Sequence, residues 1–261
     1  MARRHPKNVA QRFATLIFSA YIGVRYMKYM GSKNRIAKHL LPIMLTECEK
    51  HGITKWVEPF VGGANMIDKV PDSFERIGYD LNDHVIHALI DIRDRPNDLF
   101  DRFSKELRDF HKNDKAKKLY SHACIVTSFG ADLNGGYARE KGSDETTFCG
   151  YGKRNAIKQS PKIQNVQFIC DSYENLSFEN TLIYCDPPYQ GTTGYKTGAF
   201  DHDKFFNWCR DQAKNNIVFV SEYNAPDDFI EVWQGEIKTN FASSRKTATH
   251  NAVEKLFKAT D

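Results

Sequence analysis

The sequence lacks the patterns that mark metal-bound, disulfide-bonded and membrane-spanning proteins. Its six cysteines are scattered, and no two of them form a C-x-x-C pair, so we predict no zinc site and no disulfide framework. The longest apolar stretch, residues 14–24, is too short to cross a bilayer, which takes about 20 residues. Internal repeats and low-complexity runs are also missing. We therefore expect a cytoplasmic protein with reduced thiols, no metal and no membrane anchor.

Length and composition favour one large folded unit. The chain has 261 residues, of which 41% are apolar, and this suffices for a single α/β domain with a substantial insert. A net charge of +4 is only mildly basic, so it permits nucleic acid binding without demanding it. Residues 1–26 combine basic side chains with the short apolar stretch and so resemble a secretory signal, but no clean cleavage site follows. We expect a peripheral or dispensable basic leader here, with Met27 as an alternative start.

One apolar run ends in a turn that can carry chemistry. Residues 182–185 are typical of a buried central strand, and the run stops at Asp186-Pro187-Pro188-Tyr189. Two consecutive prolines cannot continue a sheet, because neither has an N–H group and each fixes φ. The turn therefore offers two acceptors, the Asp186 carboxylate and the Pro187 carbonyl, beside the ring of Tyr189. An amino group on a flat base fits this turn by donating to both acceptors while the base stacks on the ring; the alternative is an ordinary strand exit with a helix-capping aspartate.

A second set of residues points to a cofactor. The strand-like residues 56–60 run into Gly62 and Gly63, and paired glycines between a strand and a helix let the backbone approach a ligand closely. The full G-x-G-x-x-G pattern and a Walker lysine are both missing, so the ligand is not expected to carry a polyphosphate. Asp80 at the tip of the next strand is placed to bind ribose hydroxyls, and Asp171 at another strand tip is placed to meet an adenine amino group. An adenosine-containing cofactor without a polyphosphate indicates S-adenosylmethionine.

Lys33 occupies an unusual position for a surface residue. Residues 29–33 open a predicted helix with Ser32 as its N-cap, so Lys33 lies in the first turn. The helix dipole favours anions there, and a cation against the dipole suggests that it serves a ligand. The alternative is a solvated surface lysine.

The remaining pattern predicts alternating helices and strands. We expect further helices at residues 83–93, 97–123, 201–215 and 226–233, further strands at 76–79, 166–170, 217–220 and near 237, and a last docked element around 253–257. Residues 128–162 differ, because glycines alternate there with cations and aromatic rings. We predict a long irregular insert that contacts phosphates and stacks on bases, or alternatively a solvated surface loop.

Five of these stretches occur in the order found in one enzyme family. They are Tyr29-Met30-Gly31-Ser32-Lys33, Glu58-Pro59-Phe60-Val61-Gly62-Gly63, Asp80-Leu81-Asn82, Asp171-Ser172-Tyr173 and Asp186-Pro187-Pro188-Tyr189. The sequence resembles the DNA adenine methylase (Dam) family of N6-adenine methyltransferases, with the motif order of the α class. The resemblance implies an α/β fold, a Rossmann-like S-adenosylmethionine-dependent methyltransferase sheet of seven strands with helices on both faces. It also implies a catalytic domain of residues 27–93 and 163–261, with a target-recognition insert at 94–162.

The resemblance and the pattern together assign residues to ligands. The cofactor is expected to be surrounded by Tyr29, Lys33, Glu58, Phe60, Gly62, Gly63, Asp80, Asp171, Ser172 and Asp186. The reacting base is expected to meet Asp186, Pro187, Pro188 and Tyr189. The residues expected to contact DNA are Asn134, Tyr137, Arg139, Lys153 and Arg154. We expect double-stranded DNA as the partner of a monomer or weak dimer.

The recognition loop departs from the family pattern. The best-known members have Asn-Gly-Leu-x-Arg there, whereas in the run Asn134-Gly135-Gly136-Tyr137-Ala138-Arg139 the arginine comes one residue later. We therefore do not carry the GATC site over. Phage-encoded members have a similar run, which points to a phage or prophage origin.

The resulting hypothesis is direct transfer of a methyl group from S-adenosylmethionine to N6 of an adenine flipped out of the duplex. Asp186 and the Pro187 carbonyl would accept hydrogen bonds from the amino group and favour sp³ character at its nitrogen. Other acceptors stay open, namely cytosine N4, an RNA adenine or a protein amide, as does an inactive DNA-binding protein on the same fold. The biological role, whether restriction protection, evasion of a phage defence or gene regulation, is open as well.

Overall fold

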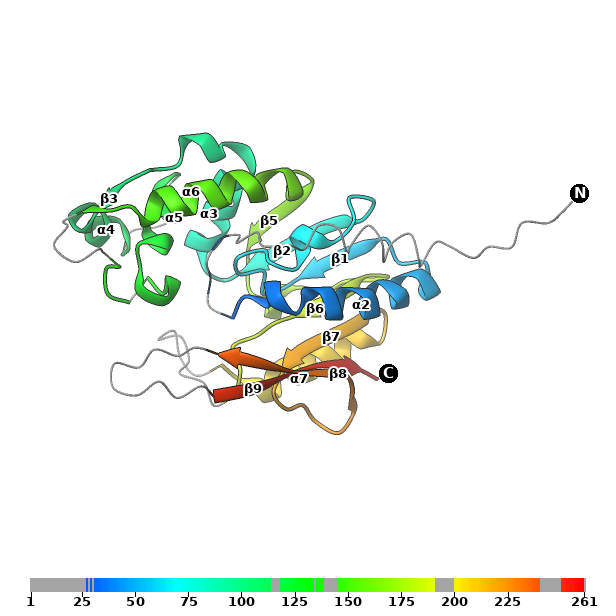
Figure 1. The fold of residues 1–261 in the computed structure, drawn as a ribbon. Coiled ribbons are helices and arrows are strands. Elements are labelled where there is room, and N and C mark those ends of the chain that lie inside the picture. Colours follow the sequence, from blue (N-terminus) through cyan, green and yellow to red (C-terminus); the bar gives the residue numbers. More distant parts are fainter. Residues whose placement is uncertain are drawn as a thin grey trace, which may run out of the picture.

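A seven-stranded sheet forms the centre of the molecule in the computed structural model (Figure 1). The structure describes residues 27, 29, 31–113, 118–133, 135–138, 145–190, 200–239 and 250–260. The predicted leader and two predicted DNA contacts, Asn134 and Arg139, lie outside the described residues. The strands of the sheet are β1 (Lys55–Glu58), β2 (Glu75–Asp80), β5 (Val166–Cys170), β6 (Leu182–Cys185), β7 (Ile217–Glu222), β8 (Phe229–Thr239) and β9 (His250–Ala259).

The order of the strands places the predicted site residues along one edge. The order is β5-β2-β1-β6-β7-β9-β8, in which the first five strands run parallel and β9 runs antiparallel to both of its neighbours. Parallel strands bring their carboxyl ends to the same edge of the sheet. Four acids therefore line this edge: Asp171 after β5, Asp80 at the end of β2, Glu58 at the end of β1 and Asp186 after β6. Open α/β sheets bind ligands at this edge. The predicted seven-stranded sheet is confirmed.

Helices cover both faces of the sheet, as predicted. Along β6, Leu182 and Tyr184 point to one face and Ile183 and Cys185 to the other, and all four are buried. The first face packs against α2 and α3, and the second packs against α7 (Figure 1). These helices are α2 (Ala37–His51), α3 (Asp83–Asp94) and α7 (His202–Ala213).

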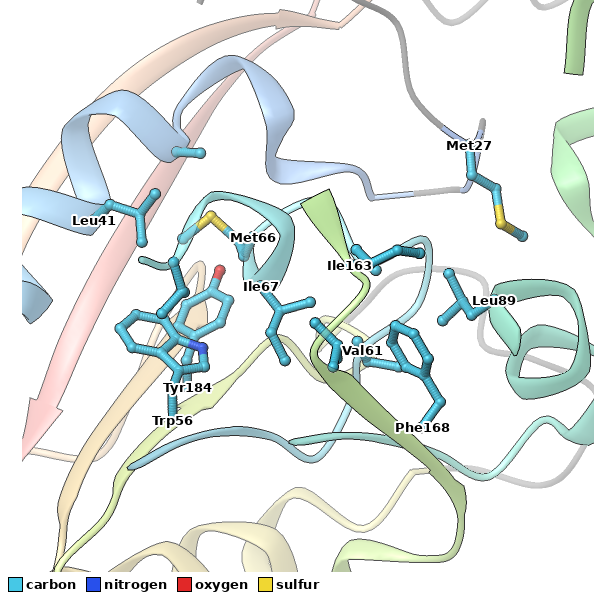
Figure 2. Packing of buried hydrophobic residues seen from close by; sticks show 14 of the residues in the cluster. Met27, Leu41, Trp56, Val61, Met66, Ile67, Leu89, Ile163, Phe168 and Tyr184 are labelled. Carbon is cyan, nitrogen blue, oxygen red and sulfur yellow. The ribbon is translucent and has the colours of Figure 1, made fainter. Parts of the chain in front are cut away.

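Two aromatic rings join β1 to β6 in the core. The rings of Trp56 and Tyr184 lie beside each other, with centroids 6.5 Å apart (Figure 2). The Trp56 indole N–H donates to Oε1 of Glu58 at 3.0 Å, and the Tyr184 hydroxyl bonds to Oγ of Ser221 at 2.8 Å. These bonds satisfy polar atoms that burial would otherwise penalise. They also fix the strands that lead to the site.

The segment between α3 and β5 is more helical than its composition predicts. It contains β3 (Phe103–Ser104), α4 (Lys105–His111), α5 (Tyr120–Val126), β4 (Glu145–Thr146) and α6 (Phe148–Gln159). A Cβ on Gly152 would lie 2.9 Å from the Val126 side chain and 3.0 Å from the His122 ring, so the missing side chain lets α6 pack closely on α5. A glycine of this segment therefore serves helix packing, and the prediction of a long irregular insert at 128–162 is wrong where α6 forms.

The predicted helix at 97–123 is also wrong in part. The described residues of this stretch are divided among the 3₁₀ helix η3 (Pro96–Asp98), β3, α4 and α5. Ser104 starts α4, because its hydroxyl accepts a hydrogen bond from the backbone N–H of Leu107 at 3.2 Å. Phe103 lies before that cap and pairs with β4, so its burial does not come from a helix face.

The structure corrects one element near the end of the chain and confirms two. The predicted helix at 226–233 is wrong, because β8 begins at Phe229 and pairs with β9, with an irregularity between Glu231 and Trp233. Pairing with a distant strand overrides local propensity here. The predicted helix at 201–215 is confirmed as α7, whose N-cap Asp201 accepts from the backbone of Lys204 at 2.9 Å. The last docked element is confirmed as β9.

The remaining elements are short 3₁₀ helices. They are η1 (Lys33–Arg35), η2 (Ile67–Lys69), η4 (Phe129–Ala131), η5 (Ser160–Lys162) and η6 (Tyr173–Asn175). Across the residues that the structure describes, no helix has the length and apolarity needed to cross a membrane.

Candidate active site

Lys33 and Asp186 form the centre of the site. Asp186 follows β6, and Lys33 begins η1, whose N-cap Ser32 accepts a hydrogen bond from the backbone of Asn34 at 3.4 Å. The Lys33 ammonium lies 2.9 Å from Oδ1 of Asp186, and the Lys33 side chain is only 5% exposed. The ammonium also donates to the Gly31 carbonyl at 3.1 Å. Lys33 is therefore no solvated surface lysine, and its place in the first turn is explained by an anionic partner.

The charges of this pair stabilise each other against burial. Burial alone would lower the pKa of Lys33, but the charges of Asp186 and Glu254 outweigh it, so its pKa is raised and the ammonium stays charged. Burial raises the pKa of Asp186 to about 6, and Lys33 opposes that rise. The Asp186 carboxylate is thus mostly ionised at neutral pH, and its pKa lies just below neutral pH.

The ring of Tyr189 is held by several neighbours. Its hydroxyl donates to Oε2 of Glu254, on β9, at 2.6 Å. The ring of Tyr223 meets it edge to face with centroids 4.7 Å apart, and the Lys33 ammonium lies 4.6 Å from its centroid. The aromatic surface predicted to receive a base therefore has a defined orientation.

Glu222 anchors the chain after the two prolines. Pro187 is buried and Pro188 is half-buried. The backbone N–H of Gln190 donates to Oε1 of Glu222 at 2.6 Å, and that of Tyr223 donates to Oε2 at 2.6 Å. Burial raises the pKa of Glu222, and these two hydrogen bonds oppose the rise. The turn is thus fixed at both of its ends.

The paired glycines form a tight turn against Asp80. Gly62 has a φ of +48°, and its N–H donates to Oδ2 of Asp80 at 3.0 Å, while Oδ1 accepts from the backbone of Asn82 at 2.9 Å. A Cβ on Gly62 would lie 3.1 Å from the Tyr29 ring, and one on Gly63 would lie 3.0 Å from the Cβ of Tyr29. Burial raises the pKa of Asp80 to about 6, with the two backbone hydrogen bonds opposing. Four residues predicted around the cofactor therefore lie together.

Asp171 and Ser172 lie next to Asp80. The backbone N–H of Asp171 donates to the Asp80 carbonyl at 3.2 Å. Its carboxylate accepts from the backbone of Ser172 at 2.7 Å and from the side chain of Asn175 at 2.8 Å. The Ser172 hydroxyl accepts from the backbone of Glu174 at 3.4 Å and so caps η6. The two acids stand at the tips of adjacent strands.

Glu58 and Phe60 have their partners within the core. Glu58 is 2% exposed and accepts from the Trp56 indole, and burial raises its pKa well above the usual value. The ring of Phe60 packs against Tyr173 at 5.4 Å and Phe205 at 5.6 Å between centroids. Their contact with a cofactor stays a prediction.

A buried arginine shapes the loop that follows α5. Arg108 on α4 is 2% exposed, and its guanidinium donates to Oγ of Ser128 at 3.0 Å, to the Leu133 carbonyl at 2.9 Å and to the Gly135 carbonyl. Ser128 and Tyr137 also form a bridge across the loop. The loop is therefore anchored to α4 at three points.

The described residues predicted to contact DNA have partners within the same segment. The Tyr137 hydroxyl donates to a backbone carbonyl of β3. Lys153 pairs with Asp101 at 2.9 Å, and the Arg154 guanidinium lies 4.5 Å from the ring centroid of Tyr151. Their contact with DNA stays a prediction.

One residue joins α6 to the glycine turn. Gln159 is fully buried at the end of α6. Its Nε2 donates to the Gly63 carbonyl at 2.9 Å, and its Oε1 accepts from the backbone of Met27 at 3.2 Å. The end of α6 is thus bonded directly to the predicted cofactor turn.

The sequence patterns missed two acids of the site. Glu222 ends β7, so an acid at a strand tip, the signal that identified Asp80, could have found it. Glu254 carries no such signal, because it lies inside the antiparallel strand β9.

A hollow of about 220 Å³ beside the turn is lined by Gln190, His202, Asp203, Phe206, Asn224, Ala225 and Pro226. Over the described ranges, no group of three or more His, Cys, Asp or Glu is arranged to hold a metal ion.

Two known proteins with similar sequences are Type II methyltransferases by name. Type II methyltransferase M.FokI from Planomicrobium okeanokoites is 24% identical over 226 residues, which is 76% of this chain and only 34% of that protein. Type II methyltransferase M.MjaIII from Methanocaldococcus jannaschii is 25% identical over 258 residues, covering 80% of this chain and 88% of that protein. Among solved structures, a putative RNA methyltransferase from Pyrococcus horikoshii superposes with a TM-score of 0.44 at 8% identity, covering 97% of this chain and 96% of that one.

A family model matches most of the chain. It is described as D12 class N6 adenine-specific DNA methyltransferase, and it matches residues 29–141 and 129–235. The two matched segments include all of the stretches that make up the site except β9. The chain therefore belongs to the D12 class N6 adenine-specific DNA methyltransferase family.

Proposed function

We propose that the protein is a site-specific DNA methyltransferase that transfers a methyl group from S-adenosylmethionine to N6 of a flipped-out adenine in double-stranded DNA. The observation that carries this proposal is the turn after β6, in which the half-buried Asp186 pairs with Lys33 and two prolines precede Tyr189. The description of the family supports adenine as the acceptor. A cytoplasmic protein that acts as a monomer or weak dimer fits this activity.

The residues around the glycine turn suit S-adenosylmethionine. At Gly62 and Gly63 an added Cβ would meet Tyr29, so the bare backbone lets Tyr29 pack directly against the turn. The acids Asp80 and Asp171 offer acceptors at adjacent strand tips, which suits the ribose hydroxyls and the amino group of an adenosine. When bound, the cofactor supplies an electrophilic methyl group on a sulfonium. The other residues that we propose around it are Lys33, Glu58, Phe60, Ser172 and Asp186.

The chain's own part in the reaction is to hold and desolvate the amino group. The Asp186 carboxylate accepts one hydrogen bond from the adenine amino group, and the Pro187 carbonyl accepts the other. These two bonds localise the lone pair of the amino nitrogen away from the ring. The Tyr189 ring stacks on the base and fixes its plane. Positioning of this kind brings reacting atoms to about 3 to 3.5 Å. Once the nitrogen has gained the methyl carbon it sheds one proton, for which the hydrogen-bonded Asp186 carboxylate is the acceptor.

We propose that residues 94–162 form the target-recognition insert and that residues 27–93 and 163–261 form the catalytic domain. The loop anchored by Arg108 supports this division, because it gives the insert a fixed shape of its own. The proposed DNA contacts are Asn134, Tyr137, Arg139, Lys153 and Arg154. Replacing Lys153 and Arg154 with alanine should weaken binding to all sequences alike and reduce the salt dependence of binding by about one unit per lost phosphate contact.

Analysis of DNA from a host that expresses the protein tests this function. We expect N6-methyladenine at one short sequence, found by sequencing and by nucleoside analysis. Asp186→Ala should abolish the modification, while calorimetry should show that the variant still binds S-adenosylmethionine through the other residues of the glycine turn. The matched control is Asp211→Ala, which removes a 69% exposed carboxylate on α7 and should remain active. N4-methylcytosine in place of N6-methyladenine would show that cytosine is the acceptor. N6-methyladenine in DNA from the host that expresses Asp186→Ala would refute the proposed role of the turn.

A role in restriction–modification is supported by the names of two relatives, which are both Type II methyltransferases. We expect DNA from the expressing host to resist a restriction endonuclease that cuts at the methylated sequence. Digestion of that DNA, with DNA from the Asp186→Ala host as control, measures the protection.

A further inference from the structure

We propose that Glu254 is a positioning residue of the active site, which holds the Tyr189 ring and the Lys33 ammonium together from strand β9. The inference rests on the proposed methyl transfer and adds a residue that neither the sequence motifs nor the matched family segments, which end at residue 235, contain. Glu254 acts through its two partners, because the atoms that meet the adenine amino group belong to Asp186 and Pro187.

One carboxylate oxygen of Glu254 serves both partners. Oε2 accepts the Tyr189 hydroxyl at 2.6 Å and lies 3.7 Å from the Lys33 ammonium. The Glu254 side chain is 11% exposed, so both interactions take place with little screening by solvent. A hydrogen bond from a phenol to a carboxylate is charge-assisted and stronger than a neutral one.

The Tyr189 ring and the Lys33 ammonium are held by the same carboxylate, that of Glu254. The Lys33 ammonium lies 4.6 Å from the Tyr189 ring centroid and 2.9 Å from Asp186, so a shift of Lys33 would disturb both. Glu254 restrains Lys33 and the end of the Tyr189 side chain at the same time. The plane on which the base stacks is thereby fixed relative to the carboxylate that receives its amino group.

The charge of Glu254 also affects the acid that contacts the substrate. Burial raises the pKa of Asp186, Lys33 and the hydroxyl of Tyr189 oppose this rise, and the charge of Glu254 adds to it. A variant without the Glu254 charge should therefore titrate Asp186 at lower pH. This titration reports the charge of Glu254 at Asp186, whereas the rate near neutral pH reports the positioning of Tyr189 and Lys33.

The test compares Glu254→Gln, Tyr189→Phe and the double variant in the full chain. The measurement is single-turnover transfer of labelled methyl groups from saturating S-adenosylmethionine to amplified genomic DNA, which carries no methylation. Glu254→Gln should lower the rate about 10- to 100-fold, as expected for a hydrogen bond to a charged group, with unchanged affinity for S-adenosylmethionine. The double variant should lose less rate than the two single losses combined, because both changes weaken the same hydrogen bond between Tyr189 and Glu254.

A matched control and a second readout complete the test. Glu231→Gln removes a carboxylate that is 36% exposed and paired with Lys255 in the same part of the sheet, and it should match the wild type. The acid limb of the pH–rate profile should move to lower pH in Glu254→Gln. Should Glu254→Gln fail to fold, Glu254→Asp keeps the charge but shortens the reach, so it should keep the acid limb and still lose rate.

Failure of this inference is distinguishable from failure of the proposed function. A wild-type protein that transfers no methyl group to adenine would refute the function. An active wild type together with a Glu254→Gln variant as fast as Glu231→Gln would refute only the role of Glu254. Losses that add up in the double variant, or an unmoved acid limb, would also refute it.

Discussion

The ammonium nitrogen of Lys33 lies 2.9 Å from a carboxylate oxygen of Asp186, and the two side chains are 5% and 20% exposed. Exposed ion pairs contribute little, but removing one partner of a buried pair leaves the other charge uncompensated. The pair therefore decides the pH range in which the Asp186 carboxylate can accept a hydrogen bond.

We expect methyl transfer to lose rate as the pH falls through about 6. Burial raises the pKa of Asp186 to about 6, so the acceptor becomes protonated below that pH. Above it, the carboxylate is ionised and the rate should reach a plateau near neutral pH. Single-turnover rates between pH 5 and 8 at saturating S-adenosylmethionine measure this limb. A flat profile across pH 6 would contradict the proposed role of the carboxylate.

Replacing Lys33 with methionine should move the acid limb of the pH–rate profile to higher pH. The Lys33 charge opposes the burial-induced rise in the pKa of Asp186, so its loss lets that pKa rise further. The free energy of unfolding should also fall, because the half-buried Asp186 would lose its partner. Lys33→Arg keeps the charge and should keep the limb near its original pH. Lys38→Met, at an exposed position of α2, is the control that should leave both quantities unchanged.

Replacing Arg108 with methionine should weaken DNA binding more than cofactor binding. The change removes the hydrogen bonds of a buried guanidinium to three residues of the loop that follows α5, and each such bond is worth about 1.5 to 3 kcal/mol. Fluorescence anisotropy with labelled duplex DNA and calorimetry with S-adenosylmethionine separate the two effects. Lys105→Met removes only an ion pair with Asp109 on the surface of α4 and is the matched control. Equal losses of both affinities would show that Arg108 stabilises the whole fold instead.

Replacing Gly152 with valine should destabilise the protein. A Cβ at this position would lie 2.9 Å from Val126 and 3.0 Å from His122, and a branched side chain would push α6 away from α5. Overpacking of this kind costs about 1 to 3 kcal/mol. Urea unfolding measures the loss, with Gly136→Ala as the control, since a Cβ there meets nothing within 4 Å. A variant as stable as the wild type would contradict the close packing of the two helices.

Local patterns in the sequence are sufficient to predict the turn after β6 and much of the sheet. The run that ends at Asp186 is apolar because β6 is buried on both faces, and the prolines that stop the strand also display the acid. Asp80 and Asp171 were predicted for the same reason, since each comes directly at the end of a strand. In each case the strand and its functional residue are neighbours in sequence.

Features that depend on distant partners were not predicted. The residues from Phe229 form a strand because β9 pairs with them, and Glu254 reaches the site through that same strand. Gly152 was interpreted as part of an irregular segment, whereas it provides room for α5. The sequence shows where glycines and polar residues occur, but not which residues distant in the sequence they will contact.

The buried amide of Gln159 has a consequence for how the two ligands of this protein influence each other. It ties the end of α6 to the Gly63 carbonyl, so the proposed DNA-binding and cofactor-binding parts share one rigid contact. If DNA orders α6, the cofactor turn should be ordered with it, and the two ligands should then bind cooperatively. Thermodynamic linkage requires this cooperativity to be reciprocal, so that DNA must increase the affinity for S-adenosylmethionine by the same factor by which S-adenosylmethionine increases the affinity for DNA.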